Sequence, residues 1–263
     1  MDTREATSES HTAEWIVENI VNAIGPSRFS GLTCDSTGNT RASRSIAILA
    51  LMPTALNLAD VCHHLNRTIL EINLITVFKP VIRVVRQTIT LFHTSHAGHA
   101  ALKKAREDLN TGRGLEAIGT TRFATIPLSA RSVHRSLPAI KKVVSKSLKG
   151  TYEQGIAEYF QLSPDDIQTF KFESGLSQFI AATLPATKAL ACLEALEATA
   201  GDVYVFWHAV IRATEDALQN PRLYFDSEVA NAIRGILNAR HRQLFLDGNI
   251  ANNAYIVAAY LNP

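Results

Sequence analysis

The sequence is poor in cysteine and has no long uninterrupted apolar run. Its 263 residues include three cysteines, Cys34, Cys62 and Cys192, which lie far apart. Their number and spacing argue against a disulfide framework, exclude a zinc site of the Cys-x2-Cys type and are typical of a reducing compartment. The two longest apolar stretches, 46–58 and 176–200, are interrupted by proline and by amide or charged side chains. Neither therefore predicts a transmembrane segment, and we expect no membrane partner.

A secretory signal and internal repeats are also lacking. The first ten residues, MDTREATSES, are polar and acidic and have no basic region followed by an apolar one. We therefore expect residues 1–10 to form a disordered tail without a secretory function. No repeat of fixed period is present, which argues against a solenoid. The remaining chain, with 46% apolar residues overall, is long enough for one large or two small packed domains.

The net charge of +2 hides an uneven distribution of charge. Segment 79–149 contains fourteen Lys and Arg residues and three acidic residues. The rest of the chain contains twelve Lys and Arg residues and twenty-one acidic residues. Such asymmetry favours a polyanion as the partner of the basic segment. We expect weak, salt-dependent and sequence-independent DNA binding through residues 79–149, with Lys141 and Lys142 among the contacts.

Hydrophobic periodicity predicts a small α/β part near the N-terminus. Residues 12–25 form an amphipathic pattern with Thr12 as the cap, and the runs 28–34 and 54–61 have the character of strands, with a further helix from about residue 39. We expect residues 11–61 to form this partial α/β core.

After residue 62 the strand signals vanish and the pattern predicts only helices. We expect a basic helical region at 62–150 and a second helical region at 151–263, so the fold class is mainly α with a small α/β remnant. The predicted helices are 62–78, 80–109, 129–148, 151–161, 164–183, 185–199, 202–219, 226–246 and 250–260.

Asp35 follows the first expected strand, in the stretch TCDSTGNT. A carboxylate just past the carboxyl end of a strand suits a divalent metal. Alternatively, Asp35 caps the next helix together with Ser36, Thr37 and Asn39. His63, in ADVCHHLN, follows the second expected strand. A parallel sheet would bring it close to Asp35.

The stretch GRGLEAIGTTRFAT places Arg122 beside Phe123 in the basic segment. An aromatic ring next to an arginine in a positive field is suited to hold an unstacked base and its phosphate. In the alternative interpretation, Phe123 fills the core and Arg122 forms an ordinary ion pair. The residues alone leave both interpretations open.

Three motifs in order, Asp-x-x-Gly-Asn from Asp35, His-x-Leu-Asn from His63 and Thr-Arg-aromatic ending at Phe123, resemble the hAT superfamily of DNA transposases. The resemblance covers residues 11–263 and is strongest over 11–140. It implies a truncated ribonuclease-H-like core of about two strands followed by a large helical insertion domain. It also implies a nuclear protein whose full-length relatives use Mg²⁺ or Mn²⁺ for phosphoryl transfer.

The resemblance also assigns roles to individual residues. Asp35 matches the second of three metal-binding carboxylates. His63 matches the histidine of a Cys-x-x-His motif in which Asp60 takes the place of the cysteine. Phe123, preceded by Arg122, matches the base-stacking aromatic residue.

The other two carboxylates and the dimerisation segment of the family are not matched in this sequence. One carboxylate cannot assemble a two-metal centre, so we expect Asp35 to be vestigial, no cofactor for this chain and no strand cleavage. An active metal-dependent nuclease would need surrogate carboxylates, for which Asp60 and Glu14 are candidates.

Two functions follow from the sequence. The first is a hAT-type transposase fragment with residual nucleic-acid binding through the basic segment. The second is a helical protein-interaction module, whose acidic and apolar half from residue 151 binds a partner such as an intact transposase chain.

Overall fold

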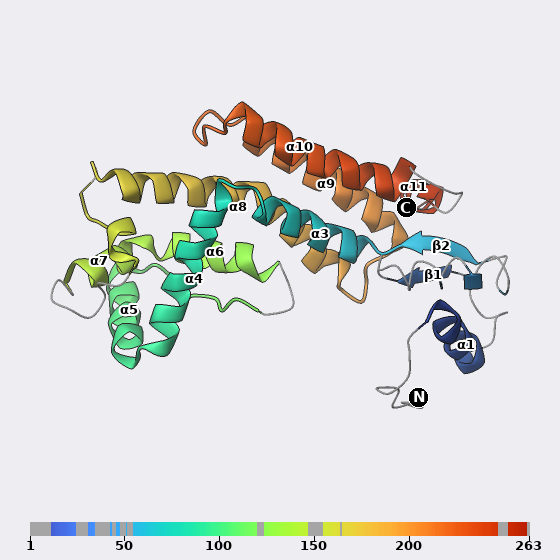
Figure 1. Ribbon diagram of the computed structural model, residues 1–263, viewed down its shortest axis with the longest axis horizontal. Coiled ribbons are helices and arrows are strands. Elements are labelled where there is room, and N and C mark those ends of the chain that lie inside the picture. The colour runs from blue at the N-terminus through green and yellow to red at the C-terminus, as the bar shows by residue number, and fades with distance from the viewer. Residues whose placement is uncertain are drawn as a thin grey trace. The chain divides into compact units, whose positions relative to one another are not determined.

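The computed structural model describes residues 12–24, 31–34, 43, 46–47, 51, 55–119, 124–146, 155–163, 165–246 and 252–261. These residues are mainly helical and include a two-stranded parallel sheet, which confirms the expected class at this level (Figure 1). The chain forms two compact units. The first unit comprises Met1–His64, Leu196–Val205 and Arg240–Pro263, and the second comprises Leu65–Ala195 and Phe206–Ala239.

The sheet belongs to the first unit. Strands β1 (Gly31–Cys34) and β2 (Leu56–Ala59) run parallel, with Gly31 opposite Leu56. Both lie within the runs predicted as strands. The predicted helix from about residue 39 lies mostly outside the described residues, as does the predicted tail at 1–10.

Helix α1 (Ala13–Ile24) begins where its sequence predicts. The Thr12 hydroxyl oxygen accepts a hydrogen bond from the Trp15 N–H at 3.2 Å, which is the contact expected of a threonine cap. Among the described side chains of this helix, Val17 is buried. A small core consists of Val17, Ala47 and Ala55, with Leu32 packed against it.

Helix α11 (Asn252–Leu261) packs on β2 and on the π-helical turn η4 (Arg242–Leu246). The Tyr255 hydroxyl donates a hydrogen bond to the Ala59 carbonyl, which ties α11 to the end of β2. The segment Leu196–Val205 of the same unit approaches α11 closely at Gly201, because a Cβ at that position would lie 3.0 Å from the Ala258 carbonyl oxygen.

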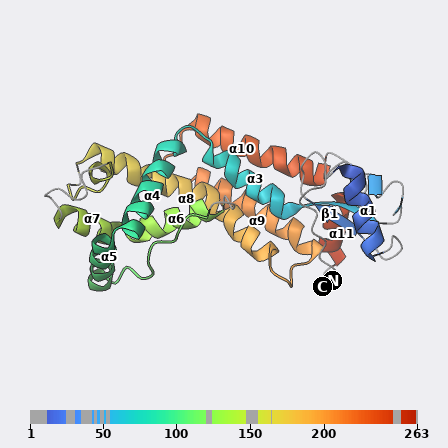
Figure 2. The same ribbon diagram turned by 60° about the horizontal axis from the view of Figure 1, so that its bottom comes forward.

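The second unit is an assembly of helices, of which α3, α9 and α10 extend into the first unit. In both views α8 lies alongside α4 and α6, and α5 packs on α4 and α7 (Figures 1 and 2). Its elements are α3 (Val61–Asn73), α4 (Phe78–Thr94), α5 (His96–Leu109), α6 (Thr125–Arg135), α7 (Leu137–Lys146), η3 (Ala157–Tyr159), α8 (Ile167–Leu193), α9 (Ala200–Leu218) and α10 (Ser227–His241).

Aromatic side chains form the core of the second unit. The rings of Phe78 and Phe179 are completely buried with centroids 5.5 Å apart, which joins α4 to α8. Gly175 lets these helices approach closely, because a Cβ at that position would lie 2.8 Å from a methyl carbon of Val81. The predicted boundary near residues 149–151 falls within this unit.

Two predicted helices are each divided in the structure. The expected helix at 80–109 is two helices, because Ser95 is extended (φ −93°, ψ 110°) and its hydroxyl caps α5 by accepting the Gly98 N–H at 3.0 Å. The expected helix at 129–148 begins earlier and is interrupted at Ser136. Ser95 thus acts as an N-cap, a role that periodicity alone does not indicate.

The predicted break at Pro185 is wrong, since α8 runs unbroken through it. Proline removes one helical hydrogen bond, but Ala182, Ala186 and Leu190 on either side are buried and hold the helix against its neighbours. The predicted helix at 151–161 is also wrong in its described part, where only the short turn η3 forms.

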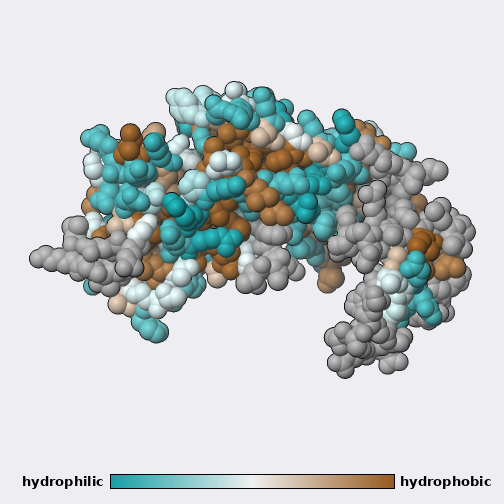
Figure 3. All heavy atoms as spheres, in the orientation of Figure 1, coloured by the Kyte–Doolittle hydropathy of each residue, from teal (hydrophilic) through white to brown (hydrophobic). Residues whose placement is uncertain are grey.

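Helix α8 is also the one helix among the described residues that is long and apolar enough, by length and composition, to cross a membrane. Its apolar side chains pack on α4, α6 and η3, as those of a core helix do. Figure 3 shows hydrophilic residues over much of one face of the second unit, with hydrophobic residues between them.

Candidate nucleic-acid interface

Three of the six residues predicted for the functional site, Asp35, Arg122 and Phe123, lie outside the described residues. His63 is half-buried in the first turn of α3. The main-chain N–H of His63 donates to a carboxylate oxygen of Asp60 at 3.0 Å, so Asp60 caps the helix. A cap explains Asp60 without a metal, and among the described residues no three His, Cys, Asp or Glu side chains are grouped as metal ligands.

Lys141 and Lys142, both predicted to contact DNA, each pair with a carboxylate. Lys141 Nζ lies 2.6 Å from Glu173 Oε1 on α8, and Lys142 Nζ lies 2.8 Å from Asp108 Oδ2 on α5. These ion pairs compete with phosphate for the two ammonium groups. They bind the basic helix α7 to its neighbours.

Asp108 lies among several lysines on the surface formed by α5 and α7. The hydrogen bond and charge of Lys142 lower the pKa of the Asp108 carboxyl, and the charges of Lys104 and Lys146 lower it further. Three lysines thus surround one carboxylate. The local charge stays positive after the Lys142 pair is counted.

Other cations of the basic segment are exposed and form no ion pair or hydrogen bond with any described residue. They come from α4, α5, α6, α7 and the loop that follows α5. These cations are Lys79, Arg86, Lys103, Lys104, Arg113, Arg131 and Lys146.

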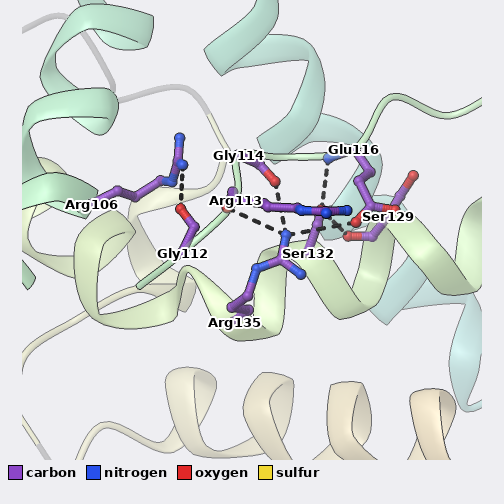
Figure 4. A network of polar contacts seen from close by, with 8 residues as sticks. All are labelled: Arg106, Gly112, Arg113, Gly114, Glu116, Ser129, Ser132 and Arg135. Atoms are coloured by element: carbon purple, nitrogen blue, oxygen red, sulfur yellow. Dashed lines mark hydrogen bonds and ion pairs between the residues drawn. The ribbon is translucent and has the colours of Figure 1, made fainter. Parts of the chain in front are cut away.

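The loop 111–119 between α5 and α6 is held by arginines from both helices (Figure 4). Arg106, in the last turn of α5, donates to the Gly112 carbonyl. Arg135, in the last turn of α6, donates through Nη2 to the carbonyls of Arg113 at 3.3 Å and Gly114 at 3.0 Å. The loop backbone is therefore fixed at its first residues.

Further contacts fix the rest of this loop. Arg135 Nη2 also lies 3.6 Å from Glu116 Oε1, and the Glu116 N–H donates to the Ser132 hydroxyl at 2.9 Å. At the far end, the Gly119 N–H donates to the Thr125 hydroxyl at 3.0 Å. The loop leads directly into the stretch that contains Arg122 and Phe123.

The sequence analysis did not identify Arg106 and Arg135 as the residues that hold this loop. Gly112 has a positive φ of 79°, which explains glycine there, and Asn110 ends α5 in the left-handed region at φ 49°. A basic residue in the last turn of a helix is a signal for contacts with nearby carbonyl groups. Both arginines occupy such a position.

Comparison of the chain with protein families, with curated proteins and with solved structures finds no match.

Proposed function

We propose that the protein binds nucleic acid through the basic segment, as a relative of hAT transposases that does not cleave DNA. The exposed cations without carboxylate partners carry this proposal, because a cation that is not neutralised within the protein is available to a phosphate. The order of a helix, a strand and a second parallel strand in the first unit supports a ribonuclease-H-like origin. A nuclear location belongs to the same proposal.

No metal-dependent step is part of this proposal. Asp35 lies outside the described residues, and Asp60 is already the cap of α3. Glu14, the other candidate for a surrogate carboxylate, is exposed on α1.

Two double variants with the same change in charge test the proposal. We expect Lys79→Ala/Lys103→Ala to reduce the slope of log affinity against log salt by about 2 for a DNA duplex, since each lysine without a carboxylate partner contributes about one phosphate contact. The control, Lys141→Ala/Lys142→Ala, removes lysines that are engaged with Glu173 and Asp108. We expect a smaller change in slope for this control.

Filter binding at several salt concentrations gives both slopes. Affinity that does not depend on salt would exclude binding to phosphates. Equal slopes for the two double variants would show that net charge, and not the free cations, governs binding.

Three exposed apolar side chains near the start of α8 support a second candidate function, a protein-interaction module. Leu162, Ile167 and Phe170, at and before the start of α8, are 64%, 63% and 67% exposed. Asp165 lies between them in sequence and is exposed. Size-exclusion chromatography with light scattering tests this function, which requires self-association or partner binding that Phe170→Glu abolishes.

A further inference from the structure

The two hydrogen bonds that Arg135 donates to the loop 111–119, here called the Arg135 clamp, orient two successive peptide groups. The carbonyls of Arg113 and Gly114 both point to Arg135 Nη2 (Figure 4). No cis peptide bond occurs among the described residues, and in a trans peptide the C=O of one residue and the N–H of the next point in opposite directions. The N–H groups of Gly114 and Leu115 therefore both point away from Arg135.

These two N–H groups have no acceptor among the described residues, and both residues are half-exposed. The N–H groups of Glu116 and Gly119 in the same loop differ, because they donate to the hydroxyls of Ser132 and Thr125. Successive N–H groups that point to one side form an anion-binding arrangement. Main-chain N–H groups are also regular ligands of phosphate in complexes with DNA.

The charges at the loop favour an anion at this position. Arg106 and Arg135 contact the loop, Arg113 belongs to it, and Glu116 is the one acidic residue within 111–119. Arg106 Nη1 lies 3.1 Å from the place that a Cβ of residue 114 would take, so a guanidinium lies directly against Gly114. The absence of a side chain at 114 leaves its N–H accessible to a phosphate oxygen.

We propose that the N–H groups of Gly114 and Leu115 hold one phosphate, close to the Arg106 guanidinium that lies against Gly114. This inference rests on the proposed function in one respect, namely that the phosphate belongs to the backbone of a bound nucleic acid. Exposed cations without a carboxylate partner on α5 and α6, such as Lys103 and Arg131, favour a polymer with many phosphates over a single free phosphate ion.

Amide NMR on the ¹⁵N-labelled full chain tests the site directly. On titration with a DNA duplex, we expect the amide protons of Gly114 and Leu115 to move downfield, as a proton does on forming a charge-assisted hydrogen bond. The amide protons of Glu116 and Gly119 are internal controls, since they already have acceptors. A duplex that binds without shifting the Gly114 and Leu115 protons beyond these controls overturns the inference and leaves the proposed function intact.

A parallel titration with inorganic phosphate separates the two failures. If the duplex does not bind, the proposed function fails. A downfield shift of Gly114 and Leu115 with phosphate then supports the site with free phosphate as its ligand, and no shift overturns the site as well.

A matched pair of variants tests the role of Arg135. Arg135→Gln releases the two carbonyls, so we expect loss of the downfield shifts of Gly114 and Leu115. Arg222→Gln removes the same charge from an exposed residue outside the basic segment and without a loop contact, so we expect the shifts to persist. Equal shifts in both variants would contradict the role of the clamp. If Arg135→Gln does not fold, the titrations of the unchanged chain decide the matter.

Discussion

The two compact units differ in how much of their structure depends on large buried side chains. The second unit buries several phenylalanines where long helices cross, among them Phe78 and Phe179. In the first unit, the described buried side chains include Val17 and two alanines beside the sheet, and Leu244, Phe245 and Tyr255 near α11. The largest described side chains that are less than 2% exposed all belong to the second unit. Buried apolar area is the main source of stability, so the second unit provides the firmer support for a binding surface.

The largest effect is expected when the core of the second unit is broken. Phe179→Ala removes a completely buried ring between α8 and α4, and we expect a loss of about 3 to 5 kcal/mol in the free energy of unfolding. Phe170→Ala is the control on the same helix, because Phe170 is 67% exposed. Urea unfolding measures both, and equal losses would contradict the packing described for α8.

Hydrogen exchange on Phe179→Ala sharpens the comparison of the two units. If the units unfold separately, the amides of α4 and α8 lose protection while those of β1 and β2 keep it. Loss of protection in all four elements together would show that the sheet depends on the helical core.

A smaller effect is expected from the close approach of α4 and α8. Gly175→Ala places a methyl group 2.8 Å from a methyl carbon of the buried Val81, and we expect a loss of about 1 to 3 kcal/mol from overpacking. Gly235→Ala on α10 is the matched control, since a Cβ there meets no atom within 4 Å. We expect this control to gain about 0.5 to 1 kcal/mol from helix propensity, as measured by thermal unfolding.

In the first unit, one hydrogen bond ties α11 to the sheet. Tyr255→Phe removes the hydroxyl that donates to the Ala59 carbonyl and keeps the buried ring, so we expect a loss of about 1 kcal/mol. Hydrogen exchange of the α11 amides measures this loss of stability. Tyr260→Phe, on the same helix but 81% exposed, is the control, and an equal effect there would contradict the role of the bond.

The smallest effects are expected at helix caps, which are alike in the two units. Hydrogen bonds from the Thr169 N–H to Asp166 and from the Thr199 N–H to Asp202 lower the pKa of each carboxyl below its ordinary value of 3.8. A lowered pKa in the folded state means that the stabilisation is complete above the ordinary value and is lost as the pH falls through the folded value.

Asp166→Asn and Asp202→Asn should therefore weaken the acid dependence of thermal stability below about pH 4. Melting curves from pH 6 to pH 2 show this as a shallower decline than in the unchanged chain. A decline of unchanged steepness would mean that other carboxyls govern acid unfolding.

The sequence predicted the local features that depend on neighbouring residues. Thr12 as a cap, the two strands and the mainly helical remainder are all confirmed. The breaks at Ser95 and Ser136 were not predicted, because a serine has the same periodicity whether it caps a helix or lies within one. Pro185 was predicted to end a helix that burial instead maintains.

The candidate site also combines features that the sequence predicts with features that only folding determines. The sequence by itself determined the excess of positive charge in the segment 79–149 and the glycines of its loop. Only the tertiary structure decided which cations are free, because Lys141 and Lys142 meet Glu173 and Asp108 from other helices. Likewise, only folding brings Arg106 and Arg135, in the last turns of α5 and α6, to one loop. The physical reason is that charge belongs to the residue, whereas its neutralisation depends on groups distant in sequence that folding brings within a few ångströms.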